Sequence, residues 1–344
     1  MRIKLTNIGM LESADVKLDG LTVIAGENDT GKSTLGKTLF ALVKADNIAE
    51  KKSQDKHREA ISTMLNMVFD SNISNNGYIM FDYNNQKVEI EIKDKKSIAK
   101  YQRPESGSSR PFFDATLVQT PIIFDLIDFF DGVSRLKVQK EMEYGMMYEI
   151  SYPYIFWDLY RKISNKNSFM GARSWHLISE TVQQIIGGEF KRDGQKFTYN
   201  KYFTGKVLQV DLANTAFGVK SFGILQLLNN NGYLNKKYVL ILDEPEVHLH
   251  PVWQLKYAEI VAKLVKHGIC VVVNSHSPYM IEALKVYSEK EDIADKTNFY
   301  LAEKENDGLL SIIRDTTNDL EPIFKKLADP FDTIEKTQID SFKW

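Results

Sequence analysis

The sequence contains little cysteine and no recognisable secretion signal. Cys270 is the only cysteine among 344 residues, which excludes a disulfide framework within the chain and a zinc site of four cysteines. A single free thiol is typical of proteins in a reducing compartment. The N-terminal segment MRIKLTNIGMLES lacks the uninterrupted apolar stretch of a secretory signal. These absences predict a soluble, cytoplasmic protein.

The sequence also has no excess of charge of one sign and no long apolar run. It has 44 basic and 46 acidic side chains, which give a formal net charge of −2. This balance excludes a protein that coats nucleic acid with its whole surface, and it leaves room only for a local basic groove. No segment approaches the roughly 20 apolar residues that a membrane helix needs. The stretch 121–130 is short and contains Asp125 and Asp128. We therefore expect no membrane partner, and DNA as a local partner at most.

Apolar residues make up 43% of the chain, enough to bury a large core. Residues 1–45 alternate short β-rich runs with turns and become helical after Gly31, where leucines recur at helical spacing. Residues 207–344 contain continuous apolar runs at 238–242 and 269–273, each followed by a helical pattern. Buried strands that alternate with helices predict an α/β fold.

The middle of the chain has a different pattern. A hairpin is expected over 77–92, followed by a loop over 93–111, where charged residues give way to Ser, Gly and Pro. The pattern beyond this loop is mostly helical. We therefore predict a discontinuous core, 1–45 and 205–344, interrupted by an insertion at 46–204 with a β-hairpin and a helical arm.

The strongest motif is GENDTGKS at 26–33, which satisfies the phosphate-loop pattern G-x-x-x-x-G-K-[ST]. The run LTVIA precedes it and a helical pattern follows, which is the strand–loop–helix context that the motif requires. Glycines let the backbone curl so that N–H groups point at phosphate oxygens, and the helix N-terminus favours negative charge. We expect ATP to be bound by Gly26, Glu27, Asn28, Asp29, Thr30, Gly31, Lys32, Ser33 and Thr34.

Two further motifs follow the apolar runs of the last zone. Asp243 and Glu244 end the first run, where ligands bind in open α/β sheets. Asp243 suits Mg²⁺ together with the Ser33 hydroxyl, and Glu244 suits the polarisation of an attacking water. His276, directly after the second run, can hydrogen-bond to a γ-phosphate or to that water. We predict Glu244, His276 and Lys32 as catalytic residues, and Ser33 and Asp243 as the metal ligands.

These motifs resemble the ATPase heads of the ABC type, and in particular the RecF/SMC/OLD branch with its bacterial relatives in phage-defence operons. IKLTNIG at 3–9 resembles the first strand and turn of that branch, and DEPEVHLHP at 243–251 resembles its joined Walker B and D-loop. SHSP at 275–278 resembles its switch-histidine motif. The resemblance covers about 1–45 and 205–285. It implies a P-loop NTPase with a mixed central sheet, flanking helices and a mostly helical insertion.

The resemblance implies two more ATP-binding elements. A signature loop, which contacts the nucleotide of an opposite subunit, corresponds to residues 214–221. Phe217 stands at the usual serine position of that loop, so the backbone donors remain but the hydroxyl contact is lost. The Q-loop glutamine corresponds to Gln119. The binding residues of the signature loop are then Gly218, Lys220 and Ser221.

The resemblance also implies a function. Two ATP molecules and their Mg²⁺ would lie between two copies of the chain and be hydrolysed there. We expect a sensor or regulator of bacterial antiphage defence that controls a separate effector, such as a nuclease or toxin. The acidic clusters 289–292 and 329–332 sit at no apolar strand end, so a nuclease site within this chain is not expected.

Other functions fit parts of the sequence. A RecF-like DNA repair or clamp ATPase is the main alternative, with the basic cluster within 87–103 as its candidate DNA contact. Sustained heptads and a C-x-x-C hook, which long SMC proteins carry, are absent from the sequence. A subunit that energises a membrane transporter fits less well, because residues 217 and 246–250 depart from that pattern. His248 and His250 suggest a metal site near Asp243, but the family form already accounts for them.

Overall fold

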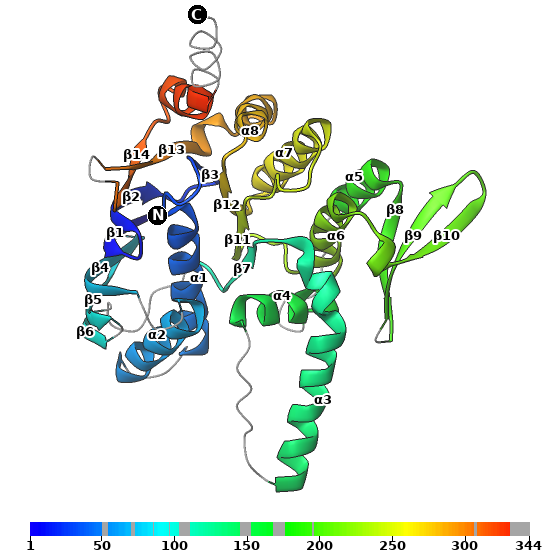
Figure 1. Ribbon diagram of the computed structural model, residues 1–344, viewed down its shortest axis with the longest axis horizontal. Helices are drawn as coiled ribbons and strands as arrows, with labels where there is room; N and C mark the ends of the chain where they lie inside the picture. The colour runs from blue at the N-terminus through cyan, green and yellow to red at the C-terminus, as the bar shows by residue number, and fades with distance from the viewer. Residues whose placement is uncertain are drawn as a thin grey trace, which may run out of the picture.

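The computed structural model describes residues 1–49, 54–69, 73–84, 86–95, 97–102, 111–144, 153–167, 176–194, 196–305 and 308–330. Most of the described strands belong to one large twisted sheet (Figure 1). In spatial order its strands are β6 (Ser97–Gln102), β5 (Gln86–Lys95), β4 (Ser74–Tyr83), β1 (Arg2–Ile8), β2 (Leu11–Lys17), β14 (Ser311–Asp315), β13 (Thr297–Lys304), β3 (Leu21–Ala25), β12 (Cys270–Ser275), β11 (Tyr238–Asp243) and β7 (Asp114–Val118).

The sheet has a parallel part and an antiparallel part. Strands β13, β3, β12, β11 and β7 run parallel to one another, so their carboxyl ends lie at one edge. Strands β2, β1, β4, β5 and β6 continue the sheet in antiparallel pairs. The mixed α/β architecture predicted from the sequence is therefore confirmed, and the parallel part carries the motifs.

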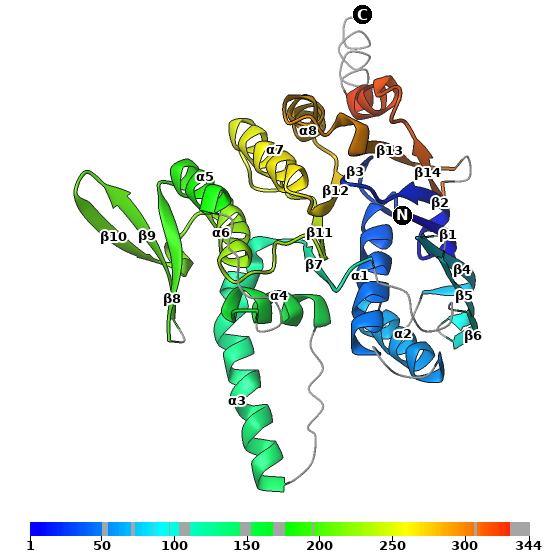
Figure 2. The ribbon, with the colours of Figure 1, turned by 180° about the vertical axis from the view of Figure 1, so that it is seen from behind.

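Helices cover both faces of the sheet (Figure 2). They are α1 (Lys32–Ile48), α2 (Gln54–Phe69), α3 (Ile127–Tyr144), α4 (Tyr154–Ser164), α5 (His176–Ile186), α6 (Phe217–Asn230), α7 (Pro251–Lys266) and α8 (Pro278–Lys290). Short 3₁₀ turns form η1 (Pro121–Leu126), η2 (Leu212–Asn214) and η3 (Ala294–Lys296), and residues 321–330 are helical. None of the described helices is both long and apolar enough to cross a bilayer.

Alternation along the buried strands builds a core on each face, because successive side chains point to opposite sides. In β12, Val271 and Val273 join the core beneath α6, α7 and α8, whereas Cys270 and Val272 join the core beneath α1 and α2. The Cys270 thiol is fully buried, and this burial raises its pKa to about 12.

A second sheet of three strands packs beside α6. Its strands are β8 (Gly188–Asp193), β9 (Lys196–Phe203) and β10 (Lys206–Asp211), and the β9–β10 hairpin extends away from the body in both views (Figure 1, Figure 2). The ring of Phe190 lies against Gly223 in α6, where an added Cβ would be 2.4 Å from Cε2 of the ring. A glycine at this helix position therefore lets the second sheet approach.

The segment 46–204 is interwoven with the main sheet, since it supplies β4, β5, β6 and β7. The predicted hairpin over 77–92 is confirmed by β4 and β5. The loop predicted over 93–111 is wrong in its first part, because β5 continues to Lys95 and β6 follows, while residues 103–110 lie outside the described part. Lys93 and Lys95 lie at the end of β5, and Lys100 lies on the edge strand β6, where a charged side chain keeps the edge from pairing with other chains.

A buried cluster of four charges joins α1, β7 and α4. Lys44 Nζ lies 2.6 Å from Asp114 Oδ1, and Lys162 Nζ lies 3.0 Å from Asp158 Oδ2 and 3.1 Å from Asp114 Oδ2. Lys44 also pairs with Asp158. Burial disfavours a charged lysine, but Asp158 and Asp114 outweigh it and raise the pKa of Lys44. The cluster therefore attaches β7 to the helix that follows the phosphate loop.

Candidate nucleotide site

The phosphate loop connects β3 to α1 at the carboxyl edge of the parallel strands. Its backbone takes left-handed conformations at Asp29 (φ 63°) and Gly31 (φ 76°), and Gly26 has a φ of 152°. An added Cβ at Gly26 would lie 2.3 Å from the Ala302 carbonyl oxygen. The glycines of the motif therefore have a steric reason to be there.

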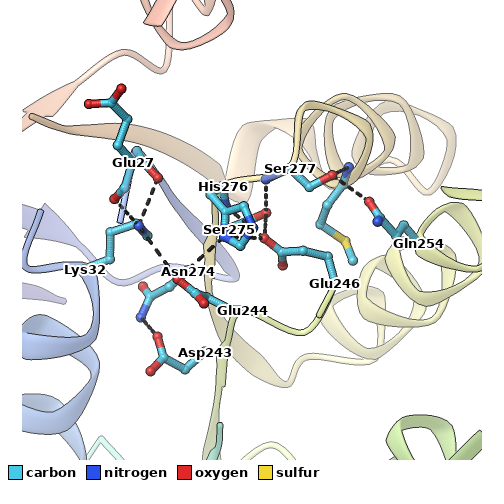
Figure 3. A network of polar contacts seen from close by, with 12 residues as sticks. Glu27, Lys32, Asp243, Glu244, Glu246, Gln254, Asn274, Ser275, His276 and Ser277 are labelled. Atoms are coloured by element: carbon cyan, nitrogen blue, oxygen red, sulfur yellow. Dashed lines mark hydrogen bonds and ion pairs between the residues drawn. The ribbon is translucent and has the colours of Figure 1, made fainter. Parts of the chain in front are cut away.

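Lys32 lies inside this loop, almost fully buried. Its Nζ donates hydrogen bonds to the carbonyl oxygens of Gly26 (2.9 Å) and Glu27, and it lies 3.9 Å from Glu244 Oε1 (Figure 3). Burial lowers the pKa of Lys32, and the carboxylates of Glu244 and Asp243 oppose that shift. A cation held in a ring of backbone groups is suited to phosphate oxygens.

Asp243, at the end of β11, is contacted from three other elements. Ser33 Oγ donates to its Oδ1 at 3.0 Å, Asn274 Nδ2 donates to the same oxygen at 2.8 Å, and Gln119 Nε2 donates to Oδ2 at 3.2 Å. These side chains come from α1, the end of β12 and the residue after β7. A carboxylate beside a hydroxyl offers the hard oxygen ligands that Mg²⁺ prefers, so the residues present fit this ion.

Glu244 and His276 face each other next to Lys32. Glu244 has a left-handed backbone (φ 53°), and its Oε1 lies 3.5 Å from Nδ1 of His276. The contact with His276 lowers the pKa of Glu244, and the same contact raises the pKa of His276. The β11–β12 register, in which Asp243 lies opposite Asn274, places the two residues at adjacent strand ends.

A buried polar network lies behind His276, and none of its residues was predicted from the sequence to belong to the site. Glu246 accepts hydrogen bonds from Ser275 Oγ (2.7 Å) and from the backbone N–H of His276 (2.8 Å). Ser277 Oγ donates to Gln254 Oε1 at 2.6 Å. Glu246, Ser275 and Ser277 lie within the motifs quoted above, so their positions were visible in the sequence, but their pairing depends on how β11 and β12 align.

The signature-loop residues lie at the N-terminus of α6, close to the segment 245–250. Lys220 Nζ pairs with Asp125 Oδ1 at 2.6 Å and lies over the Phe217 ring, while Ser221 Oγ donates to the Phe217 carbonyl. Gly218 faces the His248 backbone, since an added Cβ would lie 3.3 Å from the His248 carbonyl oxygen.

Ser221 also lines a small cavity of about 20 Å³ together with Gln119 and Glu244. The two histidines of the Walker B segment have structural contacts. His248 stacks on Phe217 with ring centroids 4.9 Å apart, and His250 caps the N-terminus of α7.

The acidic side chains of the phosphate loop are held by lysines from the end of the chain. Glu27 Oε2 lies 3.4 Å from Lys326 Nζ, and Asp29 Oδ2 accepts from Lys304 Nζ at 2.8 Å. Asp29 and Glu27 thus point toward β13 and the helix 321–330.

Three neighbouring parallel strands carry the site: the phosphate loop follows β3, His276 follows β12, and the acid pair Asp243 and Glu244 follows β11. This arrangement is that of a P-loop NTPase of the ABC-ATPase type. Residues 21–282 match a family model described as "AAA domain, putative AbiEii toxin, Type IV TA system". The chain belongs to this family. No curated protein sequence matches it.

Solved structures with a similar fold are heads of SMC proteins. The SMC head bound to the C-terminal winged-helix domain of ScpA has a TM-score of 0.52 and 13% identity, and covers 94% of this chain and 98% of that one. The Pyrococcus furiosus SMC head with an extended coiled coil, bound to the C-terminal domain of ScpA, gives a TM-score of 0.49 and 14% identity, with coverages of 95% and 98%. The Thermotoga maritima SMC head gives a TM-score of 0.48 and 14% identity, with coverages of 91% and 97%. The similarity to the SMC head bound to ScpA concerns the fold, and it agrees with the mixed-sheet P-loop fold that the sequence motifs predicted.

Proposed function

We propose that the chain binds Mg-ATP at the loop 26–34 and hydrolyses it. The observation that carries this proposal is the meeting of Ser33, Gln119 and Asn274 on Asp243. These residues are far apart in sequence, and the two amides hold the Asp243 carboxylate beside the Ser33 hydroxyl of the phosphate loop. Ser33 and Asp243 would hold Mg²⁺, which would supply positive charge next to the phosphates.

The nucleoside would lie in a groove next to Thr34. Gly9 is in close contact with Thr34, since an added Cβ would be 3.0 Å from Cγ2 of that side chain. Beyond Gly9 the surface opens into a groove of about 590 Å³. The groove is lined by the amides of Asn7, Asn75 and Asn76, which can hydrogen-bond to the edge of a nucleotide base. Met10 and Leu310 also line it and offer apolar contact to the faces of the base.

Hydrolysis requires a water in line with the γ-phosphate. Glu244 is the base that orients this water, His276 binds the water or a γ-phosphate oxygen, and Lys32 stabilises the charge on the transferred group. The distances between these residues support this assignment, because Lys32 Nζ and His276 Nδ1 both lie within 4 Å of Glu244 Oε1.

The active form would be a dimer with ATP between two subunits. The N-terminus of α6, with Gly218, Lys220 and Ser221, would contact the nucleotide of the second copy through its backbone donors. The Lys220 side chain pairs with Asp125, so the backbone donors at this end of α6 are the groups offered to that nucleotide. Exposed apolar side chains support a contact surface: Phe217 at the start of α6, Val252 at the start of α7 and Tyr279 at the start of α8.

The dimer would regulate a separate effector, a nuclease or toxin, in bacterial antiphage defence. The family description, which names a toxin of a toxin–antitoxin system, supports a role in such a two-component arrangement. A RecF/SMC-like DNA clamp is the second candidate, supported by the SMC-head fold and by exposed lysines on β5, such as Lys87 and Lys93. ATP-dependent retention of DNA duplexes by the purified chain would favour that candidate.

Phosphate release by the purified full chain tests the central proposal. We expect Mg-dependent ATP turnover, and a fall of about 10²- to 10⁴-fold in kcat for Glu244→Gln with ATP still bound. Light scattering of Glu244→Gln with Mg-ATP should show a dimer. Glu282→Gln on the exposed side of α8 is the matched control. A wild-type chain that binds no ATP contradicts the proposal, and wild-type turnover by Glu244→Gln removes the base assignment.

Phage plating tests the defence role. Cells that carry the gene with its neighbours should plate phage less efficiently than cells with Lys32→Ala in the same genes. Equal plating would contradict a role in defence while leaving the ATPase assignment intact.

A further inference from the structure

Glu246 is a carboxylate enclosed in the protein, just behind the site. Its side chain is 2% exposed, whereas that of His276 is 38% exposed. Oε1 accepts hydrogen bonds from Ser275 Oγ and from the backbone N–H of His276. Oε2 is buried and has no hydrogen-bond partner among the described residues. A buried carboxylate with an unpaired oxygen is unfavourable unless a cation lies near it, so its presence calls for an explanation.

His276 is the side chain that Glu246 faces. Nδ1 of His276 lies 3.4 Å from Glu246 Oε1 and 3.5 Å from Glu244 Oε1. The charged groups around the ring are therefore Glu244, Glu246 and Lys32. Glu244 and Glu246 favour the charged ring and raise its pKa, whereas burial and Lys32 oppose them. Because Nδ1 is the ring nitrogen that approaches both carboxylates, contact with a nucleotide falls to the other ring nitrogen, Nε2.

The turn that carries His276 is fixed from behind. Ser275 Oγ accepts from the Ser277 N–H at 3.1 Å, and Ser277 Oγ donates to Gln254 in α7. Gln254 Nε2 donates in turn to the Leu249 carbonyl at 3.0 Å. The network therefore joins the strand end at Ser275 to the segment 246–250 and to α7, and Glu246 is its carboxyl member (Figure 3).

We propose that Glu246 is a positioning residue for ATP hydrolysis, which holds the His276 backbone and ring so that the free ring nitrogen faces the nucleotide. The inference rests on the proposed ATPase function. Glu246 is enclosed, so it acts through His276 and does not touch the nucleotide itself. A loss of this carboxylate should affect the chemical step and leave ATP binding intact.

A double-mutant cycle tests the inference. Glu246→Gln keeps the size and the acceptor oxygen, so the fold should persist, which a thermal melt checks. We expect kcat to fall about 10- to 100-fold, as for other residues that orient a functional side chain, with an unchanged ATP dissociation constant. In a His276→Ala background Glu246→Gln should cause no further fall. Glu259→Gln, whose carboxylate pairs with Lys263 on α7, is the matched control and should keep wild-type kcat.

Wild-type kcat for Glu246→Gln, weaker ATP binding, or an equal fall in both backgrounds would overturn the inference. The His276 imidazole signals in NMR give a second readout that needs no turnover, with assignment from the His276→Ala spectrum. Glu246→Gln should lower the imidazole pKa, and an unchanged pKa would overturn the inference even if the wild-type chain hydrolysed no ATP. Failure of the ATPase proposal alone would show as an inactive wild-type chain with the imidazole shift still present.

Discussion

The Ser33 hydroxyl donates a hydrogen bond of 3.0 Å to Asp243, although 210 positions separate the two residues in the chain. Ser33 is the second residue of α1 and Asp243 is the last residue of β11. The contact thus joins the phosphate loop to the acid pair, and it depends on the parallel order β3–β12–β11. Asn274, between them on β12, holds the same carboxylate oxygen.

Removal of the Asn274 amide should weaken the metal site. Asn274 is fully buried and donates to Asp243 Oδ1 at 2.8 Å, so Asn274→Ala removes one of the three donors that orient this carboxylate. We expect the Mg²⁺ concentration for half-maximal turnover to rise about 10- to 100-fold. Titration of turnover with Mg²⁺ measures this, with Asn235→Ala, in a loop before β11, as the control. An unchanged Mg²⁺ requirement would show that Asn274 does not orient Asp243.

The Glu244–His276 contact should make stability depend on pH. The pKa of His276 is raised, so its stabilising effect is complete below the unfolded value of about 6.5 and is lost as pH rises through the folded pKa. The pKa of Glu244 is lowered, so its effect is present above about 4.3 and is lost as pH falls through the folded pKa.

Melting temperatures of the wild-type chain and of His276→Ala, measured from about pH 4 to 9, check this prediction. Their difference should be largest between the two unfolded pKa values and should shrink above neutral pH. A difference that grows with pH would contradict the direction of the His276 shift.

The buried four-charge cluster should be sensitive to single substitutions. Lys44→Met leaves Asp114 and Asp158 with Lys162 as their only cation in the cluster, and we expect the free energy of unfolding to fall by about 3–5 kcal/mol. Urea denaturation measures this. Lys44→Met with Asp158→Asn restores neutrality, so the double variant should lose less than the sum of the single changes. Simple additivity would mean that the four charges do not act together.

Substitution by alanine should change the free energy of unfolding in opposite directions at Gly223 and at Gly132. Alanine favours a helix over glycine by about 0.5–1 kcal/mol, and nothing lies within 4 Å of an added Cβ at Gly132 in α3. At Gly223 the Cβ would collide with the Phe190 ring, so we expect a loss of about 1–3 kcal/mol there. Denaturant unfolding of Gly223→Ala and Gly132→Ala measures the two changes in the free energy of unfolding. Equal stabilisation would contradict the packing of the second sheet on α6.

Local patterns in the sequence predicted the elements that carry the site. The strand–loop–helix around GENDTGKS and the runs that became β11 and β12 are recognisable because strand, turn and helix preferences agree there. The ATP, metal and catalytic roles of Lys32, Ser33, Asp243, Glu244 and His276 remain predictions, but the structure does bring these side chains together. The structure also brings Gln119 to Asp243, and its Q-loop role likewise stays a prediction.

Other features could not be predicted because they depend on contacts between distant segments. The run 93–102 looks like a charged loop, and only its pairing with β4 and β5 at the edge makes it a strand. Lys44, Asp114, Asp158 and Lys162 are unremarkable in sequence, and their cluster arises where α1, β7 and α4 meet. Glu246 was visible as part of DEPE, but its role depends on the β11–β12 register, which sets it behind His276.

The burial of Cys270 has a practical consequence for measuring motion. Maleimide probes react with the thiolate form of cysteine. A buried thiol with a pKa of about 12 is almost entirely protonated at neutral pH, so almost no thiolate is present to react. The native chain thus behaves toward such probes as if it had no cysteine. A cysteine introduced at Phe217 or at the tip of the β9–β10 hairpin should take a fluorophore or spin label alone, so the approach of two subunits could be followed without altering the core.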